Sequence, residues 1–203
     1  MSKAPLFQSI FGVPWAELPP VMQKHYAVRP YSLDRVVVKV IMTIRRSRLV
    51  RFLSPLLNIF GALAPYDGEN VPATVTFYSG PETSDFHIER VFEPPDKPAF
   101  RFHSRLVQVA GSDVIEYMRF GLGWRAHYRT SGNRVTLTHI GYYWRLGKFL
   151  IPVPFVWVLG KGAATEEVLT DNRFKMWMTI THPLFGVTYG YEGTFDIAAV
   201  THG

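Results

Sequence analysis

Cysteine is absent from the 203 residues, which excludes disulfide bonds, thiolate metal sites and cysteine nucleophiles. Long apolar runs are absent as well. The longest, residues 149–160, contains Pro152 and Pro154 and falls short of the ~20 residues that a membrane-spanning helix needs. The first residues lack the apolar stretch of a signal peptide. We therefore expect a cytoplasmic protein.

Sequence motifs for the common chemistries are also missing. Gly121-Leu-Gly123 lacks the third glycine of a dinucleotide fingerprint, and neither a P-loop nor a Gly-x-Ser-x-Gly elbow occurs. The seven histidines show no helical i, i+4 pair, and no spacing indicates three converging zinc ligands. Glu89 and Glu116 lie well inside expected strands, but no spacing brings them together as an acid–base pair. We expect no metal and no cofactor, and we assign no catalytic residue.

The composition favours a folded, strand-rich chain. Hydrophobic residues make up 47% of it, which excludes a disordered protein, and aromatic residues make up 15%, which favours strands and large buried surfaces. The 16 glycines and 15 prolines indicate frequent turns and few long helices. The length suits a single domain over residues 1–203, with a helical N-terminal part and one strand in residues 1–65 and an antiparallel β part in residues 71–198.

The hydrophobic periodicity predicts two helices and about nine or ten strands. Helices are expected at residues 21–26 and 47–64, the second interrupted by Pro55. Short turns between β-rich segments indicate antiparallel neighbours. We predict a mainly β (α+β) fold, an antiparallel meander curled into a barrel or half-barrel with the N-terminal helices packed on it; a two-sheet sandwich is the structural alternative. The expected strands are residues 36–44, 73–79, 86–93, 99–109, 113–120, 124–130, 134–144, 155–159, 173–181 and 187–197.

Turn chemistry indicates which side chains face the interior. If Gly111-Ser112 forms a two-residue loop, Ser104 pairs with Arg119; if Gly132-Asn133 forms the next one, Ala126 pairs with His139 and Tyr128 with Leu137. A register shift of one residue would send any of these side chains to solvent. The polar residues that this register places on the apolar inner faces, and that we predict to bind a ligand, are Arg90, Ser104, Arg119, Tyr128 and His139.

The turn His182-Pro-Leu-Phe-Gly186 is predicted to reverse the chain between the last two strands. Proline fixes φ and removes a hydrogen-bond donor, whereas glycine permits a positive φ. Phe185 is expected to plug the barrel end or the edge of the core.

The positive charge is concentrated near the N-terminus. Of the net charge of +6, residues 1–65 carry nine Lys/Arg against Glu17 and Asp34. No helix-turn-helix, zinc-finger or RNP pattern accompanies this excess, so we expect no nucleic-acid partner. The expected helix at 47–64 could pack its apolar face on the barrel or lie on an anionic membrane. The densest basic group flanks the apolar face of that helix and consists of Arg45, Arg46, Arg48 and Arg51.

Short motifs along nearly the whole chain occur in a characteristic order and spacing. They are Leu6-Phe-Gln-Ser-Ile-Phe-Gly12, Leu18-Pro, His25, Val71-Pro-Ala-Thr-Val75, Glu89-Arg90, Phe102-His-Ser104, Gly121, Ile151-Pro, Phe174, His182-Pro-Leu-Phe-Gly186, Tyr189 and Gly193.

On these motifs the chain resembles the bacterial domain-of-unknown-function family 4166. Val91 stands where the family has tryptophan after Glu-Arg, so a stacking role there is not carried over. Members of the family occur alone or fused behind a nucleotide-binding, reductase-like domain, and the family has no assigned activity. The fusion implies metabolism of a small molecule.

Three functions remain open from the sequence. The favoured hypothesis is a barrel that binds an apolar or amphiphilic small molecule in its cavity, since aromatic lining with few polar groups is typical of ligand pockets. The second is an enzyme acting on a small metabolite in the same cavity, with His139 or His103 as acid–base. The third is a peripheral membrane protein that uses the basic helix near residue 50. A solidly packed barrel with its function elsewhere on the surface is the remaining possibility.

Overall fold

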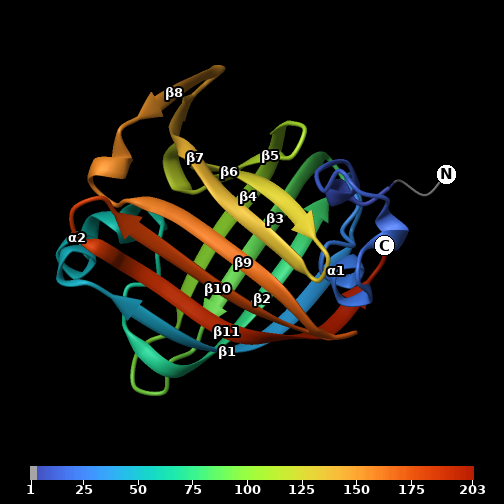
Figure 1. The fold of residues 1–203 in the computed structure, drawn as a ribbon, viewed down its shortest axis with the longest axis horizontal. Coiled ribbons are helices and arrows are strands. Elements are labelled where there is room, and N and C mark those ends of the chain that lie inside the picture. Colours follow the sequence, from blue (N-terminus) through green and yellow to red (C-terminus); the bar gives the residue numbers. More distant parts are fainter. Residues whose placement is uncertain (1–3) are drawn as a thin grey trace.

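The computed structural model of the chain describes residues 4–203, and a closed antiparallel barrel of ten strands forms its centre (Figure 1). The strands follow the order β6-β5-β4-β3-β2-β1-β11-β10-β9-β7-β8, and the additional pairing of β6 with β7 closes the ring and leaves β8 outside it. The predicted mainly β barrel is confirmed, and it is a closed barrel rather than a half-barrel or a sandwich.

The barrel strands lie between two sets of short helices. The helical elements are η1 (Leu6–Ser9), η2 (Trp15–Glu17), α1 (Pro20–His25), α2 (Arg48–Phe60), η3 (Arg119–Gly121) and η4 (Phe155–Trp157). The strands are β1 (Arg35–Arg46), β2 (Gly68–Gly80), β3 (Thr83–Phe92), β4 (Phe100–Ala110), β5 (Asp113–Tyr117), β6 (Leu122–Ser131), β7 (Arg134–Leu146), β8 (Phe149–Val153), β9 (Lys161–Thr170), β10 (Arg173–His182) and β11 (Gly186–Thr201).

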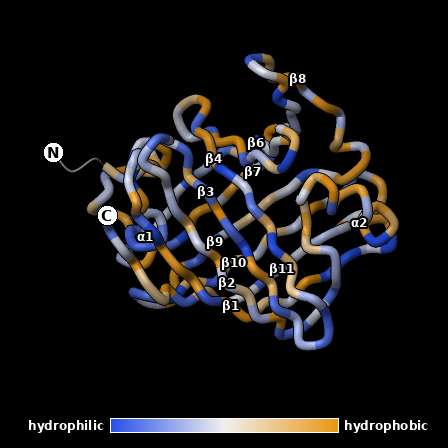
Figure 2. The backbone as a smooth tube through the Cα atoms, turned by 180° about the vertical axis from the view of Figure 1, so that it is seen from behind, coloured by the Kyte–Doolittle hydropathy of each residue, from blue (hydrophilic) through white to orange (hydrophobic). Residues whose placement is uncertain are grey.

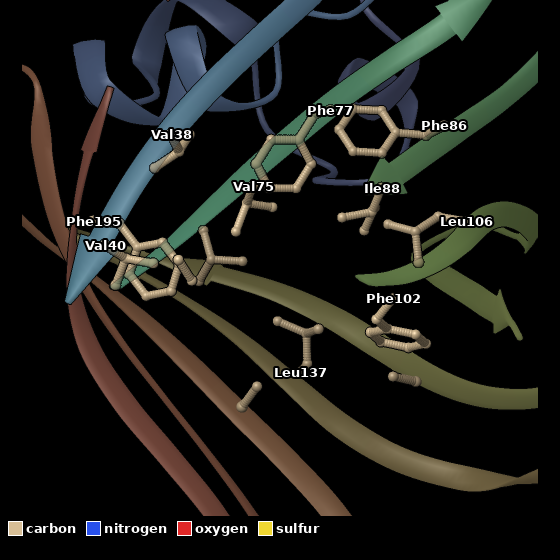
Figure 3. Packing of buried hydrophobic residues seen from close by; sticks show 14 of the residues in the cluster. Val38, Val40, Val75, Phe77, Phe86, Ile88, Phe102, Leu106, Leu137 and Phe195 are labelled. Carbon is tan, nitrogen blue, oxygen red and sulfur yellow. The ribbon is translucent and has the colours of Figure 1, made fainter. Parts of the chain in front are cut away.

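Strict alternation along the strands produces an apolar interior. In β1 every second residue from Val36 to Ile44 is buried, while the residues between them are less buried and include Lys39 and Thr43. Successive side chains of a strand point to opposite faces, so this pattern places one apolar row inside the ring. Figure 3 shows such rows meeting across the interior, with Val40 of β1 and Leu137 of β7 among them.

An aromatic cluster closes the end of the barrel where α1 and both termini lie (Figure 1). Phe7 of η1 is fully buried and packs against Tyr26 at 4.4 Å, Phe86 at 4.9 Å and Tyr128 at 5.4 Å between ring centroids. Aromatic pairs at such distances are favourable beyond the area they bury. The N-terminal elements therefore seal this end of the barrel.

Helix α2 lies at the opposite end and is continuous through Pro55. Its N-cap is Ser47, whose Oγ accepts a hydrogen bond from the Val50 amide at 3.3 Å, and Gly61 ends it in the left-handed conformation. Its buried side chains are Val50 and Leu57, so the helix does pack on the barrel. No helix within residues 4–203 is long and apolar enough to cross a bilayer.

Strands β8 and β9 were not predicted from the sequence. Strand β9 follows the stretch Lys161-Gly-Ala-Ala-Thr165, which lacks the large β-branched and aromatic residues that indicate strands. The expected strand at 155–159 is instead η4 and the turn after it, and the short strand β8 precedes it. Gly162 is small for a packing reason, because a Cβ there would meet the Trp124 ring at 3.1 Å.

The turn predicted at residues 182–186 is confirmed, because it joins β10 to β11. The role expected for Phe185 is wrong, since its side chain is 64% exposed and plugs nothing. Leu184 beside it is exposed as well.

Gly160 provides a stability test of the turn that leads into β9. Its φ is +105°, and a Cβ would lie 2.5 Å from the Thr181 carbonyl. We expect Gly160→Ala to lower the free energy of unfolding by at least about 3 kcal/mol. Gly132→Ala is the control, because Gly132 also has a positive φ but open space around it, and it should cost about 1 kcal/mol. Equal urea midpoints for the two variants would contradict this account.

Candidate functional site

The barrel encloses a cavity of about 140 Å³ with a mostly aliphatic and aromatic lining. This volume is close to that of a cavity that holds benzene. Methionine side chains adapt their shape easily, so they allow the space to adjust to a ligand. The lining methionines are Met42, Met118, Met176 and Met178, and among the labelled side chains in Figure 3 the lining includes Val75, Phe77, Ile88, Phe102, Leu106 and Leu137.

The first polar group in the cavity wall, the Arg90 cluster, consists of Arg90, Ser104 and Glu116 from three consecutive strands. Arg90 donates to Ser104 Oγ at 2.9 Å and to Glu116 Oε1 at 3.0 Å, and Ser104 donates to the same carboxylate oxygen at 2.6 Å. The guanidinium also lies 4.9 Å from the Phe102 ring centroid. Buried charges are tolerated when they are paired in this way. The cluster is an internally neutral polar patch on an apolar wall.

The second polar group, the Glu166 cluster, consists of His25, Tyr26 and Glu166 and joins α1 to β9. The Tyr26 hydroxyl donates to Glu166 Oε2 at 2.9 Å, and His25 Nε2 lies 3.5 Å from Oε1. All three residues are buried. Burial, together with the Glu166 carboxylate, raises the pKa of Tyr26 well above its ordinary value, so this phenol keeps its proton. Both carboxylate oxygens thus have a partner at the sealed end of the barrel.

Four further phenols line the cavity and belong to Tyr128, Tyr142, Tyr189 and Tyr191. Burial raises the pKa of each of them, that of Tyr191 to about 12, so all four are neutral at pH 7. The ionisable side chains on the wall are then one arginine, one histidine and two glutamates. Among the described lining residues the one arginine, Arg90, is already paired with Glu116 and there is no lysine, so the wall favours a neutral ligand group over an anionic one.

Two of the five predicted site residues line the cavity, and a third is hydrogen-bonded to one of these two. Arg90 and Tyr128 line the cavity, and Ser104, with 1% of its surface exposed, is hydrogen-bonded to Arg90. The predicted pairing of Tyr128 with Leu137 is present.

The inward placement predicted for Arg119 is wrong. The β4–β5 hairpin pairs Gln108 with Val114 and Leu106 with Glu116, with an irregularity before Ala110, so the register differs by one residue from the expected one. Strand β5 ends at Tyr117, and Arg119 lies exposed in η3. The shift places Glu116 on the inner face instead.

His139 lies in the wall beside the cavity rather than on its lining. Its predicted pairing with Ala126 is present, at a β-bulge that follows Arg125. Its Nδ1 accepts a hydrogen bond from Trp124 Nε1 at 2.9 Å, and Trp124 does line the cavity. Burial, with a smaller effect of Lys161, lowers the pKa of His139 below its ordinary 6.5. Neutral His139 therefore holds the indole in place.

Sequence reasoning missed His25, Tyr26 and Glu166 as wall residues. Glu166 follows Gly162 and Ala164 at a spacing of two, and these three are the buried positions of β9. That alternation was the available signal, but small residues gave it too little hydrophobic contrast to indicate a strand.

These features define a closed antiparallel barrel with a helical element at each end and an apolar cavity that carries two hydrogen-bonded polar clusters. The chain belongs to the family described as domain of unknown function (DUF4166), whose sequence pattern matches residues 18–195. The resemblance found from the motifs is thereby confirmed. No curated protein matches the chain. Among solved structures, a mutant of the fluorescent protein UnaG matches with 11% identity and a TM-score of 0.34, over 80% of this chain and 94% of the other.

Because Arg90 and Glu116 pair with each other, replacing one of them should destabilise the protein more than replacing both. Glu116→Leu alone leaves the largely buried Arg90 without its carboxylate, and we expect it to lower the free energy of unfolding by about 2–4 kcal/mol. Adding Arg90→Met removes the unpaired charge and should restore most of that loss. Chemical denaturation of both variants measures this, and additive losses would contradict the pairing.

The lowered pKa of His139 predicts that the stability of the protein depends on pH. As the pH falls through 6.5, the unfolded chain takes up a proton at residue 139 while the folded chain, with its lowered pKa, resists it, so the free energy of unfolding falls. His139→Asn keeps an acceptor for the Trp124 indole but does not titrate, and its stability should fall less between pH 7.5 and about 5.5. His87, whose pKa is lowered mainly by burial, remains in both proteins and cancels in the difference. Parallel pH profiles would show that His139 is not the titrating group.

Proposed function

We propose that this protein binds a small apolar or amphiphilic molecule in the barrel cavity. The observation that carries the proposal is the lining itself, in which aliphatic, aromatic and methionine side chains surround a small number of fixed polar groups. Sites of this makeup recognise an apolar body by burial and orient it through a few hydrogen bonds. The proposal agrees with the small-molecule context that the family resemblance implies.

The polar end of such a ligand would be neutral and would meet the Arg90 cluster. Glu116 already neutralises Arg90, but the guanidinium has five N–H donors and only two of its nitrogens are engaged with Ser104 and Glu116. Tyr128 offers a neutral hydroxyl on the same lining. A carbonyl, hydroxyl or ether group on the ligand therefore matches this wall better than a carboxylate does.

The entrance is proposed to lie at the α2 end of the barrel. The opposite end is filled by η1 and α1, where Phe7 and Val21 are fully buried. At the α2 end the lining includes Ala62, Leu63 and Met118, which are only partly buried. Movement of residues 62–64, which follow the glycine that ends α2, would open the cavity without breaking the closed ring of strands.

An enzyme that acts on a small metabolite in the same cavity is the second candidate. It is favoured by the 3.5 Å approach of His25 to Glu166, which pairs a base with a carboxylate on the cavity wall. Tyr26 occupies the other carboxylate oxygen, so a reaction would have to use His25. Turnover of a bound molecule recovered from the protein would favour this candidate over simple binding.

Two neighbouring alanines of β9 test binding in the cavity. Ala164 is buried and lines the cavity, whereas Ala163 is exposed on the outer face. We expect Ala164→Leu to weaken binding of the neutral single-ring probe toluene by about tenfold or more, because the added carbon atoms occupy the ligand's space. Ala163→Leu, the same change facing outward, should bind as the parent does, and isothermal titration calorimetry measures all three proteins.

Circular dichroism and thermal melting show whether each variant is folded before the titration. Equal probe affinity in folded Ala164→Leu and in the parent would refute binding in the cavity. Native mass spectrometry of the purified protein provides a second reading, since a co-purified small molecule present in the parent should be lost in Ala164→Leu and kept in Ala163→Leu.

A further inference from the structure

Exposed apolar side chains are concentrated at one end of the barrel. Twenty large hydrophobic side chains in the described part of the chain are exposed, and fourteen of them belong to the end that carries α2. These are Phe52, Leu56, Ile59, Phe120, Trp144, Leu146, Phe149, Leu150, Ile151, Trp157, Val158, Leu184, Phe185 and Val187. Scattered exposed residues need no explanation, but a concentration of this kind indicates an interaction surface.

Four chain segments form this surface, which we call the docking end: residues 45–66, 118–124, 141–165 and 181–190. Direct contacts join them. Phe60 of α2 packs edge-on against Phe120 at 6.0 Å and Trp144 at 6.4 Å between centroids, and Trp144 Nε1 donates to the Phe120 carbonyl at 2.7 Å. Figures 1 and 2 both show α2 and β8 toward one end of the barrel, away from α1 and the termini.

Residues 181–190 belong to the same surface, because they contact α2 and η4 directly. The Ser47 amide, at the start of α2, donates to the Thr188 carbonyl at 2.7 Å. The His182 ring lies 3.1 Å through Nε2 from the Trp157 carbonyl. The exposed Leu184–Phe185 turn and η4 are therefore neighbours of α2 and not separate patches.

Helix α2 presents apolar side chains on its solvent side as well as on its barrel side. Val50 and Leu57 are buried against the barrel, whereas Phe52, Leu56 and Ile59 recur at spacings of four and three and are 83%, 52% and 57% exposed. A helix of a globular protein ordinarily places polar residues on its solvent side. The outward apolar row is therefore available to a partner.

The charge of the docking end has one sign. Its four segments contain eight Lys/Arg and no Asp or Glu. Asp67, from the adjoining loop, pairs with Arg46 and Arg51. In residues 4–203 the other six have no carboxylate partner; they are Arg45, Arg48, Arg119, Arg145, Lys148 and Lys161. The partner of this surface must therefore be apolar and anionic together.

We propose that the docking end binds the surface of an anionic lipid bilayer. Phenylalanine, leucine and isoleucine side chains of α2 and of the turns would enter the boundary between headgroups and acyl chains, as in interfacial amphipathic helices. Tryptophans suit this boundary because their rings are apolar and their N–H is polar. The unpaired arginines and lysines would bind lipid phosphates. The proposal does not depend on the ligand of the cavity.

Vesicle flotation with the full-length protein tests the proposal. With phosphatidylcholine vesicles that contain phosphatidylglycerol, we expect co-flotation at low ionic strength that is at least about tenfold stronger than with phosphatidylcholine alone. Binding should weaken as salt is raised past the physiological range, because screening shortens the reach of the lipid charge.

Two pairs of variants locate the surface. Phe52→Ser with Trp157→Ser should reduce vesicle binding by at least about tenfold. The control, Leu33→Ser with Leu169→Ser, changes two exposed hydrophobic residues at the far end and should bind as the parent does. Arg48→Glu with Lys148→Glu should remove most of the salt-dependent part, whereas Lys39→Glu with Arg129→Glu changes the net charge equally on the barrel wall and should retain most of the binding.

Three outcomes would overturn the membrane assignment. The first is no binding to the anionic vesicles at low salt by the folded parent. The second is equal binding by the docking-end and control variants. The third is concentration-dependent dimer formation in analytical ultracentrifugation that Phe52→Ser with Trp157→Ser abolishes, because the surface would then fit a second copy of this chain.

Discussion

The hydrogen-bonded ladder between β6 and β7 is the constraint on which the rest of the structure depends. This pairing joins the first half of the meander to the second and converts an open sheet into a ring. Closure removes the free edges among these strands and forces every second side chain into one shared interior. The apolar cavity, its two polar clusters and the two distinct ends of the barrel all follow from that ring.

Inside such a ring each charged group needs a partner, and the partners come from different strands. Arg90 of β3 reaches Glu116 of β5 across Ser104 of β4, so the ion pair spans three neighbouring strands and depends on their register. Glu166 of β9 contacts His25, the last residue of α1, and accepts a hydrogen bond from Tyr26, which follows it, so the N-terminal seal is joined to the barrel. These hydrogen bonds thus link neighbouring strands to one another and the N-terminal residues to the barrel, and within residues 4–203 they leave no unpaired arginine in the interior.

The sequence was most informative where periodicity was strong and least informative where register was decided by a single irregularity. Alternation in β1, and turn chemistry at Gly132-Asn133, predicted a barrel and the pairing of Tyr128 with Leu137 correctly. A one-residue irregularity near Ala110 exchanged Arg119 for Glu116 on the inner face, and no local signal distinguishes the two registers. Strand β9, and with it Glu166, was not predicted because its small residues give little strand signal. At Gly162 the Trp124 ring leaves little room for a larger side chain.

The two ends of the barrel differ in where their aromatic side chains lie. At the α1 end, aromatic residues such as Phe7 turn inward and are buried, while at the α2 end residues of the same kind, such as Phe52 and Trp157, turn outward. Exposing them costs free energy in water unless something covers them in the working state. The charged residues at the two ends differ as well. At the α1 end the Glu166 carboxylate contacts residues of the seal, whereas at the α2 end basic residues that have no carboxylate partner in the described chain lie near the exposed aromatic side chains. The two ends of the barrel therefore differ, one sealed and the other apolar and basic, and the proposed membrane contact lies at the same end as the proposed entrance to the cavity.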